Sequence, residues 1–126
     1  FRRPAENWDI MQYFEPSRCI TYDELAAVQK KFQHVSLAKP HPYTFAKAVL
    51  GDSCSEFELA HGKYDKKQME KVLVVGDAGA DLFAAKEMGA KFAAVLTGVN
   101  GQASRTFFEV QGADFILDSV LNLIEA

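Results

Sequence analysis

The stretch Val72–Gly89 has the sequence VLVVGDAGADLFAAKEMG. Its first four residues are aliphatic without interruption, which predicts a parallel strand buried on both faces. The spacing of apolar residues from Asp81 to Met88 predicts a helix, and Gly89 is a residue type that commonly ends one. A second apolar run, 92–96, leads into Thr97-Gly98. The stretch therefore predicts a strand–helix–strand unit.

The remainder of the chain extends this alternation of strands and helices. Apolar spacing predicts helices over residues 5–14, from Asp23 through Val28, 43–50, 104–110 and 120–126, and strands over 18–22 and 113–117. The polar connection 52–68 is long for an α/β protein, so it contains either a short helix or an insertion particular to this protein. The alternation predicts an α/β fold with a mainly parallel sheet and flanking helices, and residues 1–126 are expected to belong to one domain.

Composition excludes several classes of protein. The chain has 126 residues, of which 48% are hydrophobic and 25% charged, and no apolar run is long enough to cross a bilayer. A net charge of −3 without a basic stripe argues against nucleic-acid binding. Cys19 and Cys54 lie far apart and have no zinc-ligand spacing, so we expect reduced thiols and a cytoplasmic location.

Two aspartates are the candidate functional residues of the quoted stretch. Asp77 directly follows the buried strand, and Asp81 falls in the first turn of the helix. Gly76 and Gly79 would allow the backbone to approach a ligand closely. Ligands of open parallel sheets bind beyond the carboxyl ends of the strands, and two carboxylates close together there favour a cation. Either aspartate alone would more commonly be a capping residue, and His41, between two prolines, is interpreted as a turn residue.

Taken whole, Val72–Gly89 resembles the fourth motif of phosphatases of the haloacid dehalogenase (HAD) superfamily, a hydrophobic strand followed by GDxxxDxxAAxxxG. Residues 37–42, LAKPHP, are similar to the KPxP element of the third motif, and Lys39 stands at the position of the lysine of that motif. Residues 112–119 resemble the last strand and terminal helix of the family. The resemblance covers residue 5 to the end and implies a Rossmann-like HAD core. The spelling DLFAAKEMG is most similar to the phosphoglycolate-phosphatase and phosphoglucomutase-like branch.

The first two motifs of that superfamily have no counterpart in this sequence. Members carry DxDx(T/V) near the N-terminus, and no Asp-x-Asp occurs here. The resemblance implies that residues 1–126 are the C-terminal portion of a HAD-like core domain, with the cap and first strands absent. The missing N-terminal half of the same protein would then be a necessary partner, and the fragment alone is expected to be inactive and to need that half for a native fold.

The resemblance also implies a mechanism. Asp77 and groups of the missing first motif would hold Mg²⁺, Asp81 would support the metal site, and Lys39 would balance negative charge on the substrate phosphate. The reaction is phosphomonoester hydrolysis of a small phosphorylated metabolite through an aspartyl-phosphate. This assignment requires Lys39 and Asp77 to converge on one anion pocket.

Two alternatives are weighed against the phosphatase. A metal-independent dehalogenase would depart from the Gly76-Asp77 pair that is preserved here. A non-catalytic binding or interaction module would keep the fold while lacking the first motif, since fold alone does not establish function. The presence or absence of an upstream DxDx(T/V) motif separates the module from the enzyme.

Overall fold

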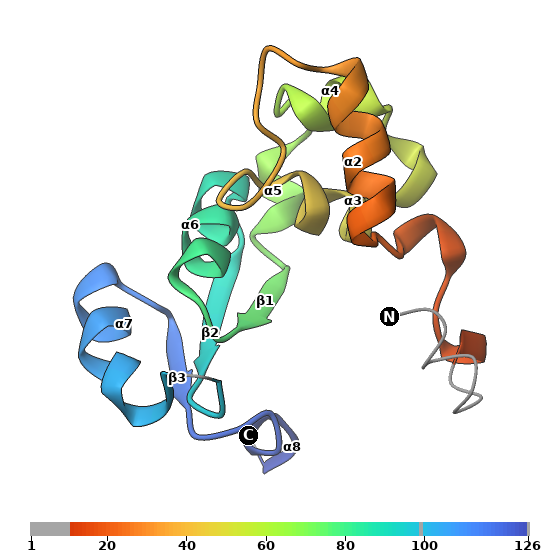
Figure 1. The fold of residues 1–126 in the computed structure, drawn as a ribbon. Coiled ribbons are helices and arrows are strands. Elements are labelled where there is room, and N and C mark those ends of the chain that lie inside the picture. The colour runs from red at the N-terminus through yellow and green to blue at the C-terminus, as the bar shows by residue number, and fades with distance from the viewer. Residues whose placement is uncertain (1–10, 99, 126) are drawn as a thin grey trace. The chain divides into compact units, whose positions relative to one another are not determined.

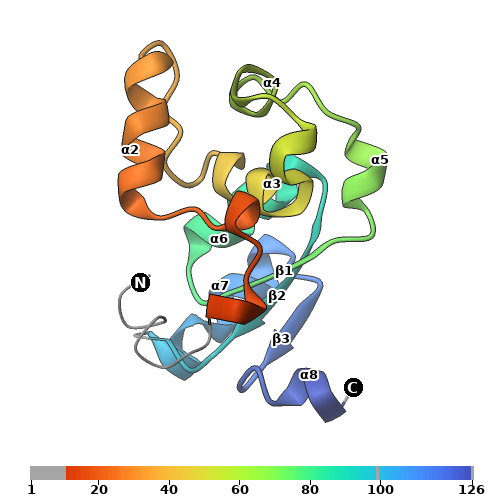
Figure 2. The ribbon, with the colours of Figure 1, turned by 90° about the vertical axis from the view of Figure 1, so that its right-hand side faces the viewer.

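The structure, a computed structural model, describes residues 11–98 and 100–125. The chain divides into two compact units, residues 1–64 and 65–126, which we call the N-terminal unit and the C-terminal unit. The described part of the N-terminal unit contains helices and turns, whereas the C-terminal unit contains the strands β1, β2 and β3 together with helices (Figures 1 and 2). None of the helices in the described ranges is both long and apolar enough to cross a membrane.

Short helical elements make up the described part of the N-terminal unit. They are η1 (Met11–Tyr13), η2 (Pro16–Arg18), α2 (Tyr22–Lys31), α3 (Tyr43–Leu50), η3 (Gly51–Ser53) and α4 (Glu56–Ala60). The helix predicted over residues 5–14 lies largely outside the described residues, and its described end forms η1. The connection 52–68, for which a short helix or an insertion was considered, contains α4 and the start of α5.

The strand predicted over residues 18–22 is wrong. Cys19 and Thr21 do have extended backbone angles, as their β-prone neighbours suggest, but the sheet of the described residues contains only β1, β2 and β3. Extended residues become a strand only when their backbone groups pair with a neighbouring strand. Thr21 instead begins α2: its hydroxyl accepts from Glu24 N–H at 3.4 Å, and the Glu24 carboxylate accepts from Thr21 N–H at 2.7 Å. The helix predicted from Asp23 therefore begins one residue earlier, at Tyr22, with Thr21 as its cap.

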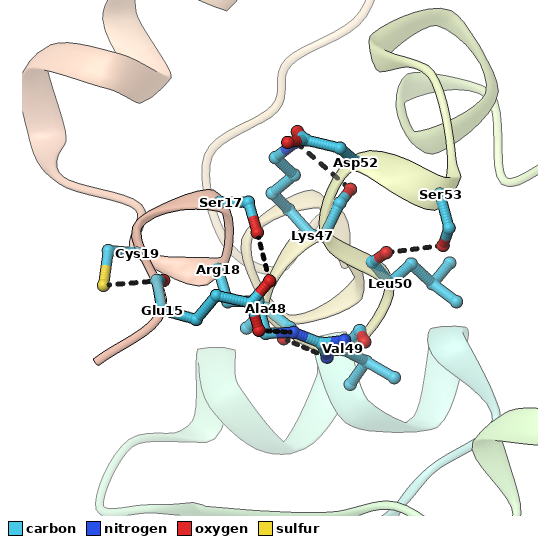
Figure 3. Close-up of polar contacts among 11 residues, drawn as sticks. Glu15, Ser17, Arg18, Cys19, Lys47, Ala48, Val49, Leu50, Asp52 and Ser53 are labelled. Atoms are coloured by element: carbon cyan, nitrogen blue, oxygen red, sulfur yellow. Dashed lines mark hydrogen bonds and ion pairs between the residues drawn. The ribbon is translucent and has the colours of Figure 1, made fainter. Parts of the chain in front are cut away.

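Helix α3 confirms the prediction for residues 43–50. Its apolar face buries Tyr43 and Ala46, and Gly51 ends the helix with φ 57°, a backbone angle that favours glycine. The carbonyl groups at this end are satisfied by side chains (Figure 3). Arg18 Nη1 donates to the carbonyls of Ala48 and Val49, and Lys47 Nζ donates to Gly51 O at 3.1 Å. Polar contacts therefore hold the end of α3 firmly to the preceding segment.

Around Arg18, a second set of contacts fixes the segment before α2. Glu15 accepts hydrogen bonds from Ser17 Oγ at 2.7 Å and from Arg18 Nε at 2.9 Å (Figure 3). Lys47 Nζ also pairs with Asp52 at 2.9 Å beyond the helix end. Because Arg18 joins Glu15 to the end of α3, η2 and α3 form one packed corner of the N-terminal unit.

The C-terminal unit is the predicted α/β sheet. Its elements are α5 (Lys66–Met69), β1 (Leu73–Gly76), α6 (Gly79–Met88), β2 (Lys91–Val95), η4 (Gly101–Ser104), α7 (Arg105–Gln111), β3 (Phe115–Leu117) and α8 (Asn122–Glu125). The strands are parallel in the order β1-β2-β3, with Val75 opposite Ala93 and Ala93 opposite Phe115. The fold class, α/β with a parallel sheet and flanking helices, is thereby confirmed.

Helices α6 and α7 lie on the same side of this sheet (Figure 1). Leu82 and Met88 of α6 are fully buried, and the rings of Phe92 in β2 and Phe108 in α7 lie 5.9 Å apart. Gly89 ends α6 in the left-handed region at φ 91°, as the sequence predicted. Apolar contacts between these helices and the strands hold the carboxyl end of β1 in place, because burial of such side chains is the main stabilising term.

The outer edge of β1 pairs with no strand among the described residues, since β2 occupies only its inner edge. Val74 is buried, whereas Leu73 and Val75 are 40% and 36% exposed. The sequence predicted a strand buried on both faces, as in the interior of a parallel sheet. The residue types therefore fit an interior strand, but β1 lies at an edge.

Candidate functional site

Asp77 lies at the carboxyl end of β1, beside the end of β2. Gly76 is in register with Ala94, so the two strands end side by side. The exposed Asp77 side chain packs against Gly98, where an added Cβ would come within 2.6 Å of the Asp77 Cβ and closer still to its Oδ2. Only a residue without a side chain leaves room for the carboxylate there, so Gly98 helps to position Asp77.

Asp81 is held in the first turn of α6, close to the same strand end. It is 6% exposed, and a Cβ added at Gly76 would lie 2.6 Å from Asp81 Oδ2 and 2.8 Å from its Cβ. Its backbone N–H donates to Ala78 O at 3.1 Å as the helix begins. A negative charge in this first turn is favoured by the unpaired N–H groups and the dipole of the helix.

Gly76 and Gly79 both allow close packing within the chain itself. Gly76 accommodates Asp81, as described above, and a Cβ at Gly79 would lie 2.9 Å from the Phe107 ring of α7. Gly79 therefore permits α6 and α7 to approach each other. The use of these glycines for close approach to a ligand stays a prediction.

The two carboxylates suit a hard divalent cation, because Mg²⁺ prefers oxygen ligands and commonly takes one or two protein carboxylates. The glycine at position 76 lets the buried Asp81 carboxylate lie against the strand end from which Asp77 projects, so the residues present fit such an ion. Within residues 11–98 and 100–125, no group of three His, Cys, Asp or Glu side chains is arranged to hold a metal. Asp77 and Asp81 would therefore supply part of a coordination shell.

Lys39 belongs to the N-terminal unit, in the exposed segment before α3. Its ammonium lies 5.1 Å from the centre of the Phe45 ring, within the range of a cation–π contact, and the Lys39–Pro40 peptide bond is cis. The structure thus brings Gly76, Asp77 and Asp81 together within the C-terminal unit. Convergence of Lys39 with Asp77 stays a prediction.

His41 makes hydrogen bonds that stabilise the turn before α3, which agrees with its interpretation as a turn residue. Its Nδ1 accepts a hydrogen bond from Tyr43 N–H at 3.0 Å, and its Nε2 lies 3.0 Å from Ala60 O. Since the carbonyl only accepts, the ring must carry its proton on Nε2. The ring therefore caps the first turn of α3 and ties it to the end of α4.

One pocket of about 300 Å³ lies wholly within the N-terminal unit. Apolar and charged side chains line it, among them Ile20, Val28, Tyr43, Lys31, Lys47 and Glu56. Burial, with a smaller contribution from the charge of Glu56, raises the pKa of Tyr43 to about 12. None of the predicted site residues lines this pocket, so it contributes nothing to the carboxylate site.

Sequence reasoning missed the part that Gly98 plays in the site. The sequence analysis placed Gly98 after the second apolar run and gave it no function. A glycine just after a parallel strand, next to a strand that ends in aspartate, is the signal that could have identified it, because neighbouring parallel strands end at the same edge.

Comparisons with known proteins support the family and the fold. The family model described as HAD-hydrolase-like matches residues 36–123, a range that includes Lys39, Asp77 and Asp81. A solved X-ray structure, a structural-genomics target, is similar over 98% of this chain with a TM-score of 0.82 and 25% sequence identity. The chain spans 33% of the length of that protein. Comparison with curated proteins finds no significant match.

Proposed function

Because the chain belongs to the HAD-hydrolase-like family, we propose that it contributes part of the active site of a Mg²⁺-dependent phosphomonoester hydrolase. The observation that supports the proposal most directly is the placement of Asp77 and Asp81 at the carboxyl end of β1. That edge is where parallel sheets bind ligands, and the match includes both aspartates. A small phosphorylated metabolite is the proposed substrate.

In this proposal the residues of the chain have distinct roles. Asp77, exposed and packed on Gly98, would bind Mg²⁺ directly, and the buried Asp81 would support the site from the first turn of α6. Bound Mg²⁺ would supply positive charge that offsets the negative charge of the phosphoryl oxygens. Lys39 would place its ammonium on the same phosphate, which its flexible stem and compact charge suit.

The proposal requires a nucleophile that these 126 residues do not provide in the Asp-x-Asp form. We assign it to an N-terminal half of the same protein, which would add a strand beside β1. The outer edge of β1 supports this, since no strand among the described residues pairs with it and Val75 is 36% exposed. The aspartate on that strand would attack phosphorus and displace the alcohol of the substrate, and water would then hydrolyse the aspartyl-phosphate to release phosphate and restore the aspartate. The branch similar to phosphoglycolate phosphatases remains the proposed subgroup.

The lack of Asp-x-Asp also favours one rival, a non-catalytic module that keeps the fold without the chemistry. The two proposals predict different results for the complete protein. A phosphatase has an upstream DxDx(T/V) motif and hydrolyses phosphomonoesters, whereas the module lacks both.

The test is hydrolysis of p-nitrophenyl phosphate by the complete protein, with and without Mg²⁺. Removal of Mg²⁺ should abolish activity, and Asp77→Asn should lower kcat at least ~100-fold, the scale of losing one strong electrostatic contact in a transition state. Asp23→Asn is the matched control, because Asp23 is an exposed aspartate on α2, remote in sequence from the motif. Full activity of Asp77→Asn, or equal activity in the absence of Mg²⁺, would contradict the proposal.

A further inference from the structure

Two histidines of the N-terminal unit meet through their ring nitrogens. His34 lies in the exposed turn after α2, and His61 is the half-buried C-cap residue of α4. Their Nε2 atoms are 2.7 Å apart, their ring centres are 5.0 Å apart, and the ring planes differ by 21°. The centre separation exceeds the nitrogen separation by close to two ring radii, so the rings point at each other nitrogen to nitrogen and are nearly coplanar.

The hydrogen bonds around the pair determine where its protons lie. His61 Nδ1 is 2.8 Å from Phe57 O, and a carbonyl only accepts, so His61 Nδ1 carries a proton. In a neutral ring, His61 Nε2 is then a lone-pair acceptor, and His34 Nε2 must donate to it. A single proton therefore lies between the two Nε2 atoms, donated by His34 and accepted by His61.

Neighbouring side chains keep the two rings in this position. The Phe57 ring lies 4.3 Å from the ring of His61, and the Phe32 ring lies 6.0 Å from His61 and 6.5 Å from His34. The Phe32 and Phe57 rings restrict rotation of the imidazole rings that they pack against and cover part of the imidazole surface. The ring of His61 is therefore held more tightly than the ring of the exposed His34.

Charged side chains of the segments that carry the pair have partners of their own. Lys31 is paired with Glu56 at 3.0 Å, and the Lys63 ammonium lies 5.0 Å from the centre of the Phe57 ring. The Glu58 carboxylate accepts from Ser55 N–H at 3.2 Å, and that bond is the main reason that the pKa of Glu58 is lowered. Each of these charged groups therefore has a contact of its own that does not involve the imidazoles.

We propose that His34 and His61 form a binding site for a borderline transition-metal cation such as Zn²⁺ or Ni²⁺, which takes the place of the shared proton. The His34 proton moves from Nε2 to Nδ1, so both rings stay neutral and both Nε2 lone pairs bind the metal. Tetrahedral zinc with Zn–N bonds of about 2.0–2.1 Å requires the two nitrogens to be about 3.3 Å apart. From the collinear arrangement with 2.7 Å between the nitrogens, the His34 ring must move outward and turn, so that both Nε2 lone pairs meet the metal at about 109°. The exposed turn that carries His34 allows this movement.

The contact of His61 with Phe57 O supports this site. Histidines that bind metals usually donate their other ring N–H to a carbonyl or carboxylate, which fixes the tautomer and the ring orientation. His61 already makes this contact, at 2.8 Å. In the described ranges no third His, Cys, Asp or Glu completes a ligand group, so water fills the remaining positions. The proposal does not rest on the proposed function, because Mg²⁺ selects oxygen ligands and not imidazole.

The test is isothermal titration of the complete protein with Zn²⁺, Ni²⁺ and Mg²⁺ separately, using the variants His34→Gln and His61→Gln. One zinc ion per chain should bind at the pair, and each substitution should weaken Zn²⁺ binding at least five-fold. Neither substitution should change the binding of Mg²⁺. Gln33→Ala, in the same exposed turn, is the matched control and should keep the affinity of the unsubstituted protein.

NMR spectroscopy tests independently whether Zn²⁺ binds at His34 and His61. In NMR spectra of the unsubstituted protein, Zn²⁺ should shift the ring-proton signals of His34 and His61 and leave those of His41 in place. Circular dichroism verifies that both variants are folded, which the exposed position of His34 favours. If either substitution weakens Zn²⁺ less than five-fold, or if Asp77→Asn removes the zinc affinity instead, the two-histidine site is overturned.

Discussion

Substituting Gly76→Ala tests whether the end of β1 is built around the Asp81 carboxylate. The added Cβ would lie 2.6 Å from Asp81 Oδ2, 2.8 Å from its Cβ and 2.9 Å from its Cγ. Asp81 is 6% exposed and sits in the first turn of α6, so its side chain has little free space into which it can move. Either the carboxylate is displaced or the strand and helix move apart.

The cost follows from two opposing terms. Forcing a methyl group into a packed site typically costs about 1–3 kcal/mol. Replacing glycine with alanine also raises the free energy of unfolding by about 0.4–1 kcal/mol, because the unfolded chain loses conformational freedom. We therefore expect Gly76→Ala to lower the free energy of unfolding by about 1–2 kcal/mol. Mg²⁺ binding at the proposed site should also weaken, because either response changes the position of the Asp81 carboxylate relative to Asp77.

Urea unfolding of four proteins in a double-mutant cycle measures this effect: the unsubstituted protein, Gly76→Ala, Asp81→Ala and the double variant. Asp81→Ala removes two of the three clashing atoms, so the Gly76→Ala substitution should cost about 1 kcal/mol less in the Asp81→Ala background. Effects that add to within about 0.5 kcal/mol would show that the two positions do not interact, and our reasoning about this site would be refuted.

Two further predictions concern the N-terminal unit. Thr21→Ala removes the hydroxyl that accepts from Glu24 N–H in the capping box of α2, and it should lower the free energy of unfolding by about 1 kcal/mol, measured by urea unfolding. The control is Thr106→Ala, at an exposed threonine, and an equal loss in both variants would show that the hydroxyl of Thr21 does not stabilise the helix as a cap. The pKa of Tyr43 is raised from 10.0 to about 12 by burial and by Glu56, so its contribution to stability is complete below pH 10 and is lost as the pH rises towards 12. Stability measured at pH 8 and at pH 11 should therefore fall less for Tyr43→Phe than for the unsubstituted protein, and an equal fall would exclude this group.

The strand–helix–strand unit was predictable because its signals are local. An aliphatic run, helical spacing and a glycine after the helix are each visible within Val72–Gly89, and the structure places β1, α6 and the turn at Gly89 accordingly. The same holds for α3, where Gly51 ends the helix. Residues next to each other in sequence decide these elements, so tertiary contacts change only their bounds.

The predictions that were wrong, and the site residue that was missed, depend on contacts between residues that are distant in the sequence. The extended segment 18–22 has β-prone residues, but a strand also needs a partner, and the sequence of the segment does not contain that information. The part played by Gly98 was missed for the same reason, since 21 positions of chain separate it from Asp77 and only the parallel register of β1 and β2 brings them together. The start of α2 was predicted at Asp23, whereas Thr21 caps the helix because Glu24 completes a capping box with it.

The edge position of β1 connects the fold to the proposed chemistry. Parallel strands are usually buried on both faces and lie inside a sheet, and the sequence of β1 has that character, yet no strand of the described residues pairs with its outer edge. An exposed, apolar edge offers unpaired N–H and C=O groups that another strand can satisfy. A strand added there would end next to Asp77, since parallel neighbours finish at the same side of the sheet. We infer that the residue following such a strand, on the other side of β1 from Gly98, is where the nucleophile of the complete protein would have to lie.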